Sequence, residues 1–146
     1  MIHTDLLMLK AEIKDKAVAA LEEMRTDPTL LALGATGVMV SETLRELAVQ
    51  MAYFSRSRML TQDVQAMYKA AGLYAIGPAE AARAATWTLD SKHLHGEAID
   101  LVPTRKGKPW WNAPSEVWTR MGAIGEKYGL AWGGRWKNRD TPHFEV

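Results

Sequence analysis

The spacing of apolar residues changes at about residue 87, and this change constrains the fold more than any other feature of the chain. Before it, apolar residues recur every three or four positions, as in residues 6–24, which is the spacing of amphipathic helices. After it, short segments such as residues 98–102 alternate apolar and polar side chains as strands do. Because these strands do not alternate regularly with helices, we expect an α+β fold with a small antiparallel sheet packed with several helices.

The expected elements follow from this spacing and from turn-forming residues. We predict helices over residues 6–24, 42–54, 61–72, 78–85 and 115–129, and short strands over residues 38–40, 98–102, 130–132 and 143–146. A length of 146 residues is that of one domain. We therefore expect a single domain over residues 1–146, with a helical half over about residues 1–87 and a strand-and-loop half over about residues 88–146.

The composition excludes several kinds of function. The chain has no cysteine, so any metal must be held by histidines and carboxylates. Lys and Arg total 18 against 17 Asp and Glu, and this balance argues against a helical DNA-binding domain in the first half or any other nucleic-acid partner. The first residues do not resemble a secretory signal, and no apolar run approaches about 18 residues. We expect a monomer made in the cytoplasm without stable membrane association.

Three of the four histidines lie in the strand-and-loop half, where carboxylates are close in sequence. His93 and Asp100 are seven positions apart, and on one unbroken strand this odd spacing would place them on opposite faces. Gly96 provides a place for a turn or bulge that could bring both side chains to one point. His95 competes with His93 for this role, and spacing alone does not choose between them.

The end of the chain provides the second half of this cluster. Pro142 favours an extended conformation of the preceding residue, so Asp140 should lie in the turn before the strand that carries His143. The Asp140 carboxylate could then reach whatever His143 binds. Two histidine nitrogens and one aspartate oxygen leave a fourth position open, which is the arrangement of a catalytic zinc site.

These residues together resemble a known family. The pattern Ser-x-His-x-x-Gly-x-Ala-x-Asp over residues 91–100, followed by Asp-x-x-His over residues 140–143, is similar to the zinc metallopeptidases that comprise D-Ala-D-Ala carboxypeptidases and L-alanyl-D-glutamate endopeptidases. Within that family the chain most resembles phage endolysins. The resemblance extends over about residues 91–146 and implies the hedgehog/D,D-peptidase fold, with the zinc site on the sheet.

The resemblance also implies roles for individual residues. It makes His93, Asp100 and His143 the zinc ligands, leaves His95 outside the ligand set, and makes Asp140 the general base that takes a proton from the attacking water.

Upstream, the family usually has an arginine at the start of a helix that follows a strand, and a glutamine after it. Arg45 and Gln50 match this pattern best, with Arg45 stabilising the oxyanion or binding a substrate carboxylate. Arg56 and Arg58 are the alternatives to Arg45.

Further candidates surround the two motifs. Glu145 is two positions from His143 on the same strand face and could orient that ligand, and Ser91 begins the first motif. Trp132 and Trp136 flank the second motif, and we expect one or both to form a wall of the cleft.

The resemblance implies a zinc-dependent peptidase that cuts the peptide stem of peptidoglycan, at the L-alanyl-D-glutamate bond, as an endolysin. The alternatives are a D,D-carboxypeptidase or dipeptidase with the same metal residues, and a non-catalytic zinc-binding module, against which Asp140 argues. We expect no separate cell-wall-binding domain. A lysin without a signal peptide would stay in the host cytoplasm until another protein permeabilised the membrane.

Overall fold

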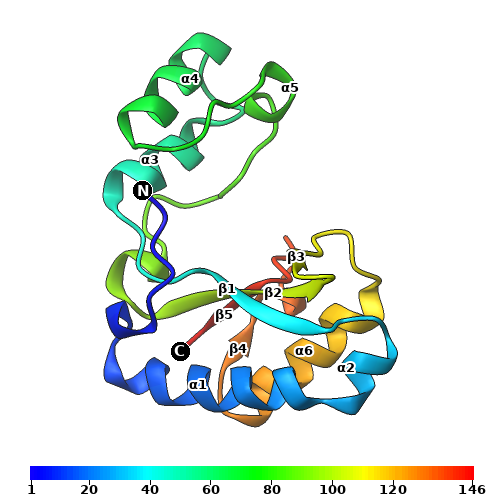
Figure 1. Cartoon of the computed structure of the whole chain (residues 1–146). Helices are drawn as coiled ribbons and strands as arrows, with labels where there is room; N and C mark the ends of the chain where they lie inside the picture. The colour runs from blue at the N-terminus through cyan, green and yellow to red at the C-terminus, as the bar shows by residue number, and fades with distance from the viewer.

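A five-stranded antiparallel sheet organises the chain in the computed structural model, which describes residues 1–146. The strand order is β1-β2-β5-β4, and β3 pairs with the end of β2. Two distant parts of the sequence therefore meet at β2, which lies between β1 and the last strand of the chain (Figure 1). The strands are β1 (Gly37–Glu42), β2 (Ala98–Arg105), β3 (Lys108–Pro109), β4 (Ala131–Trp132) and β5 (His143–Glu145).

Three helices cover one face of the sheet, below it in Figure 1. They are α1 (Ala11–Thr26), α2 (Pro28–Ala32) and α6 (Ser115–Lys127), and together with the sheet they enclose a core of 19 buried residues. Gly125 of α6 lets this helix lie close to β5, because a Cβ there would be 2.3 Å from the Phe144 ring. We call this part of the molecule, the sheet with α1, α2 and α6, the sheet body.

The other three helices form a separate group that Figure 1 shows standing away from the sheet. They are α3 (Leu47–Ser55), α4 (Thr61–Ala70) and α5 (Pro78–Ala81), and they enclose a second core of seven buried residues. We call residues 47–81 the helical lobe. Two chain segments, residues 43–46 and 82–91, join the helical lobe to the sheet body.

The structure confirms the α+β fold with a small antiparallel sheet and several helices. Residues 1–87 contribute to both regions, because α1, α2 and β1 belong to the sheet body. None of the helices has the length and hydropathy needed to cross a bilayer.

Some predicted boundaries are wrong. The helix expected over residues 42–54 begins only at Leu47, because β1 continues to Glu42, which pairs with Asp100 of β2. The helix expected from residue 78 ends at Ala81 instead of residue 85. The first predicted helix is divided into a 3-10 turn, η1 (Leu6–Met8), and α1. Neither α2 nor β3 was expected, and such short elements depend on tertiary contacts more than on their own periodicity.

Candidate active site

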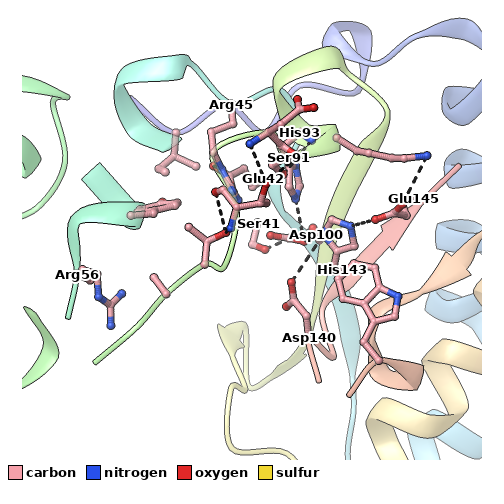
Figure 2. A pocket seen from close by; sticks show the side chains of 18 of the residues that line it. Ser41, Glu42, Arg45, Arg56, Ser91, His93, Asp100, Asp140, His143 and Glu145 are labelled. Carbon is pink, nitrogen blue, oxygen red and sulfur yellow. Dashed lines mark hydrogen bonds and ion pairs between the residues drawn. The ribbon is translucent and has the colours of Figure 1, made fainter. Parts of the chain in front are cut away.

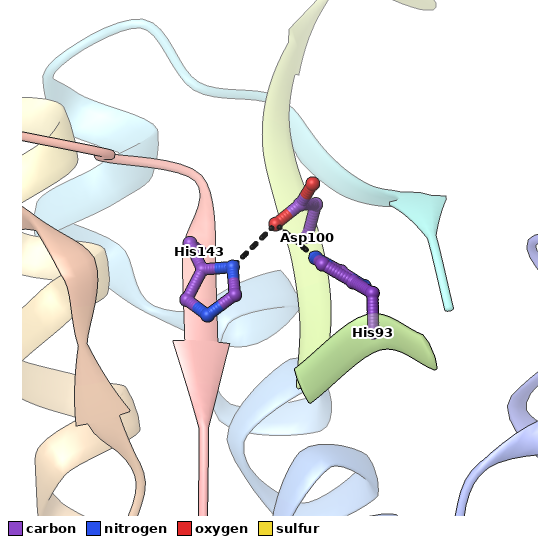
Figure 3. A group of neighbouring side chains, drawn as sticks. All are labelled: His93, Asp100 and His143. Atoms are coloured by element: carbon purple, nitrogen blue, oxygen red, sulfur yellow. Dashed lines mark hydrogen bonds and ion pairs between the residues drawn. The ribbon is translucent and has the colours of Figure 1, made fainter. Parts of the chain in front are cut away.

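Three side chains that could bind a metal converge where the adjacent strands β2 and β5 meet the short 3-10 helix η2 (Lys92–His95). Asp100 and His143 are direct partners in the antiparallel pairing of β2 with β5, so their side chains lie on the same face. His93 comes from η2, and Gly96 ends that helix in the left-handed conformation, with φ of 67°. This turn brings His93 beside Asp100, as Figure 3 shows.

The distances within this cluster suit a zinc ion. The Asp100 Oδ1 atom lies 3.2 Å from His93 Nε2 and 3.4 Å from His143 Nδ1, and all three ligand atoms lie within 4.8 Å of one another. Zinc bonds of about 2.0–2.1 Å at tetrahedral angles place ligand atoms roughly 3.3 Å apart. The three residues therefore present the donor types and spacing that such an ion requires.

Hydrogen bonds fix the orientation of both histidine rings. The Nδ1–H of His93 donates to the Thr43 carbonyl over 2.7 Å, which leaves the lone pair of Nε2 facing Asp100. The Nε2–H of His143 donates to Glu145 Oε1 over 2.8 Å, which leaves Nδ1 facing the same carboxylate. Metal-binding histidines are commonly held in this way by a carbonyl or carboxylate on the other ring nitrogen.

The charges in the cluster shift its titrating groups. Burial alone would raise the pKa of Asp100, but the two histidines outweigh it and hold that pKa well below its usual range. Burial alone would lower the pKa of His143, and hydrogen bonding to Asp100 with the charge of that carboxylate gives a net rise. Asp100 is thus ionised at neutral pH, as a metal ligand must be.

Asp140 lies in the turn before β5, as Pro142 indicates. Its Oδ2 atom is 3.8 Å from His143 Nδ1, and its side chain is 49% exposed to the cleft. Gly133 permits this turn, because a Cβ there would lie 2.4 Å from the Asp140 carbonyl oxygen. Burial, and then the charge of Asp100, raises the pKa of Asp140. The structure thus places a carboxylate of increased basicity next to the cluster.

Arg45 lies in the bend between β1 and α3, and not in a helix as predicted. Its Nε donates to both carboxylate oxygens of Glu42 over 3.1 Å, its Nη2 pairs with the same carboxylate, and its Nη1 donates to Gln50 Oε1 over 2.8 Å. The backbone N–H of Arg45 donates to the His93 carbonyl over 2.9 Å. Arg45 is therefore fixed relative to the cluster, and Gln50 helps to hold it.

The two alternatives to Arg45 occupy different places. Arg56, at the end of α3, lines the same cleft as the cluster but on the helical lobe. Arg58 does not line the cleft, since its guanidinium lies over the Phe54 ring at 3.9 Å and donates to the carbonyls of Phe54 and Thr86.

The remaining predicted residues are divided between the cleft and the core. Ser91 lines the cleft and caps η2, where its hydroxyl accepts from the His93 N–H over 3.3 Å. Trp136 is 41% exposed and its ring lies 4.9 Å from that of His143. His95 is exposed and pairs with Asp90, outside the cluster.

The prediction that Trp132 forms a cleft wall is wrong. It is buried in the core of the sheet body, where Gly122 and Gly134 leave room for the indole, because a Cβ at either position would lie within 2.3 Å of the ring. Its Nε1–H donates to the Thr141 carbonyl over 2.8 Å and so supports the turn between Asp140 and His143 from behind.

The cluster lies in an open cleft of about 830 Å³ between the sheet body and the helical lobe (Figure 2). Both regions contribute to its lining, which includes Trp111 and Trp136 from the body and Tyr53, Tyr74 and Glu80 from the lobe. A substrate bound along the cleft would contact both regions.

Sequence reasoning missed two residues that organise the site. Glu42 is buried and neutralises Arg45, and Thr43 is buried and accepts the hydrogen bond from His93. A carboxylate at the end of a strand is usually solvated, and a backbone carbonyl leaves no mark on residue type. The only available signal for Glu42 was its position three residues before Arg45, a spacing at which such charges often pair.

Comparison with known proteins agrees with this geometry. Residues 84–146 match the family model described as D-alanyl-D-alanine carboxypeptidase, and this segment contains all three residues of the cluster and Asp140. This part of the chain is therefore similar to the zinc metallopeptidase family that its sequence motifs resemble, and that resemblance is confirmed. No curated protein sequence gives a significant match.

Two similar solved structures are peptidases. The L-Ala D-Glu endopeptidase ChiX of Serratia marcescens is 24% identical, with 88% of this chain and 86% of that chain covered and a TM-score of 0.48. A mutant of the vancomycin-resistance D,D-pentapeptidase VanY from a VanB-type cassette, in complex with Zn(II), is 13% identical, with 94% and 72% covered and a TM-score of 0.55. The likeness to VanY shows a shared fold.

Proposed function

We propose that the chain is a zinc-dependent peptidoglycan peptidase that hydrolyses the L-alanyl-D-glutamate bond of the peptide stem and acts as an endolysin. The observation that carries this proposal is the cluster of His93, Asp100 and His143 in an open cleft with Asp140 beside it. The match of residues 84–146 to a peptidase family supports the peptidase activity. The resemblance of the two sequence motifs to those of phage endolysins supports the choice of bond and the lytic role.

The residues divide the chemistry between them. His93 Nε2, Asp100 Oδ1 and His143 Nδ1 would hold the zinc, and Thr43 and Glu145 keep the two imidazoles in the required orientation. A zinc ion bound there would polarise the scissile carbonyl and lower the pKa of water. The Asp140 carboxylate then takes the proton of the attacking water and returns it to the leaving amine.

Arg45 lies beside the cluster, where its side chain could assist the hydrolysis. Glu42 and Gln50 hold its guanidinium in one orientation, and Arg45 lines the cleft. A fixed donor of this kind stabilises negative charge on a carbonyl oxygen or binds a carboxylate of the substrate. The charge of Glu42 offsets that of Arg45, so the contribution of Arg45 comes from directed hydrogen bonds.

A D,D-carboxypeptidase is the second candidate, because the matching family is described by that activity. It would use the same cluster and the same Asp140. The two activities differ only in which part of the stem lies across the cluster, and this depends on the cleft walls.

Digestion of purified sacculi by the zinc-loaded protein tests both candidates. Mass spectrometry of the products should show new amino termini on D-glutamate and L-alanine left on the glycan. Release of D-alanine alone would replace the proposed bond specificity with the D,D-carboxypeptidase activity, and absence of any product would refute the peptidase.

The lytic role needs a separate test inside a bacterium. Expression of the protein should leave turbidity constant until the inner membrane is permeabilised, and lysis should then follow within minutes. The Asp140→Asn variant is the control, since it retains the fold and lacks the proposed base. Lysis of equal extent by this variant would refute a lytic role for the peptidase activity.

A further inference from the structure

The end of the cleft away from the metal-binding cluster carries a second group of polar side chains. Figure 2 shows Arg56 on the helical lobe, across the cleft from His93 and His143. Tyr53, Tyr74 and Glu80 line the cleft on the same side. None of these residues contacts the cluster, so they would bind a different part of a ligand from the part that lies at the cluster.

The Arg56 guanidinium is held through two of its three nitrogens, Nε and Nη1. Its Nε donates to the carbonyls of Glu80 and Arg83 over 3.1 and 3.0 Å, and its Nη1 lies 3.5 Å from the Tyr68 hydroxyl. Its Nη2 forms no hydrogen bond within the chain. Because the side chain is only 13% exposed and lines the cleft, the two N–H groups of Nη2 are left for a bound ligand.

The nearest carboxylate does not use these donors. Glu80 Oε1 lies 3.6 Å from Arg56 Nη1, which is beyond hydrogen-bonding distance, and it accepts a hydrogen bond from the Tyr74 hydroxyl. The Glu80 carboxylate therefore offsets part of the positive charge of Arg56, and the Glu80 backbone carbonyl helps to orient the guanidinium. The two N–H groups of Nη2 remain available.

Tyr53 connects this end of the cleft to the cluster end. Its ring lies 4.8 Å from the Arg45 guanidinium on one side and 6.0 Å from the Tyr68 ring on the other. Its hydroxyl donates to no group of the chain, and burial, then the charge of Glu42, raises its pKa well above the usual range of a phenol. The phenol therefore stays protonated and is a second hydrogen-bond donor between the two arginines.

We propose that Arg56 and Tyr53 form a subsite for a carboxylate of the peptide stem that lies away from the scissile bond. This inference rests on the proposed function, because peptide stems carry several carboxylates along a short chain. A guanidinium with unshared N–H groups binds a carboxylate strongly and a neutral carboxamide weakly. The helical lobe thus selects substrates by charge at a distance from the chemistry.

The test uses the zinc-loaded full-length protein and synthetic stem peptides in which each carboxylate in turn is a carboxamide. Amidation of the carboxylate that binds in the subsite should raise KM about 10- to 100-fold, because a charge-assisted hydrogen bond is lost, and it should change kcat little. Equal KM values for the acid and every amide would overturn the subsite.

Variants then assign the effect to Arg56. Arg56→Gln should lose the preference for the acid over that amide, and Tyr53→Phe should reduce it, while zinc content stays at the wild-type level. Arg58→Gln is the matched control, because Arg58 belongs to the same lobe and does not line the cleft, so it should keep the full preference. A full preference in a folded Arg56→Gln protein would remove Arg56 from the subsite.

Calorimetric binding of the same peptides separates this inference from the proposed function. If the wild type cleaves no stem peptide, the proposed function fails, yet acid and amide peptides can still be compared by affinity. If Arg56→Gln does not fold, as circular dichroism would show, the acid-to-amide comparison on the wild type and on Tyr53→Phe decides the matter.

Discussion

The sheet body and the helical lobe contribute differently to the same cleft. The sheet body has a core of 19 buried residues and holds the three side chains that could bind a metal, together with Asp140. The helical lobe has a core of seven buried residues and contributes Tyr53, Arg56 and Glu80 to the opposite wall.

The two regions thus meet two different requirements of a hydrolase. Ligands of a metal must be held to within a fraction of an ångström, and paired strands under a closely packed helix provide that rigidity. A wall that selects among substrates needs less rigidity and can belong to a smaller unit. Gln50 of the helical lobe, which is fully buried, bonds to both segments that join the two regions, to Arg45 in the first and to the Thr88 carbonyl over 2.7 Å in the second.

The largest effect is expected from the proposed metal ligands of the sheet body. His93→Ala should abolish both zinc binding, expected at about one ion per chain, and peptidase activity, because it removes one of three ligands. Metal analysis by mass spectrometry and a sacculus assay measure the two properties. His95→Ala is the control and should retain both, since His95 is exposed and lies outside the cluster. The opposite outcome for the two variants would reverse the ligand assignment.

Asp140→Asn should separate catalysis from metal binding within the sheet body. The amide keeps the size of the side chain but cannot accept the proton, so kcat should fall by roughly 10²- to 10⁴-fold with zinc still bound. Asp90→Asn is the matched control, because that exposed carboxylate pairs with His95 and should not affect kcat. Wild-type turnover by zinc-loaded Asp140→Asn would exclude Asp140 as the base.

Arg45 tests the junction between the two regions. Arg45→Ala should lower kcat/KM by about 10²- to 10³-fold with zinc retained, and Arg45→Lys should restore only part of it, because lysine lacks the planar arrangement of donors. Since Arg45→Ala leaves Glu42 buried without its partner, the double variant Arg45→Gln with Glu42→Gln is the necessary comparison. Full activity in the double variant would show that the guanidinium takes no part in the reaction.

The smallest effects are expected from matched substitutions in the two cores, which compare their stabilities directly. Ile99→Val in the sheet body and Ile76→Val in the helical lobe each remove one buried methylene, at a cost of about 0.5–1.5 kcal/mol. Denaturant unfolding should show the loss for Ile99→Val. Hydrogen exchange should show faster opening for Ile76→Val only within residues 47–81. Equal acceleration throughout the chain in both variants would mean that the two regions open as one unit.

Local sequence patterns were sufficient for much of the fold. The apolar spacing that predicts α1, α4 and α6 depends on residues one turn apart, and the alternation in residues 98–102 depends on neighbouring positions. The turn at Gly96 follows from the freedom of glycine to adopt positive φ, and the placement of Asp140 before β5 follows from the restriction that Pro142 imposes on the preceding residue. These features are local, and so they could be predicted without knowledge of the packing.

The sequence by itself determined which residue types could bind a metal, but the tertiary structure decided which of them meet. His93 and His95 belong to the same short helix, and only packing buries the first beside Asp100 and leaves the second 53% exposed. In the same way it placed Trp132 in the core and Arg56 on the cleft. Such choices depend on contacts between residues far apart in the chain, which no local preference encodes.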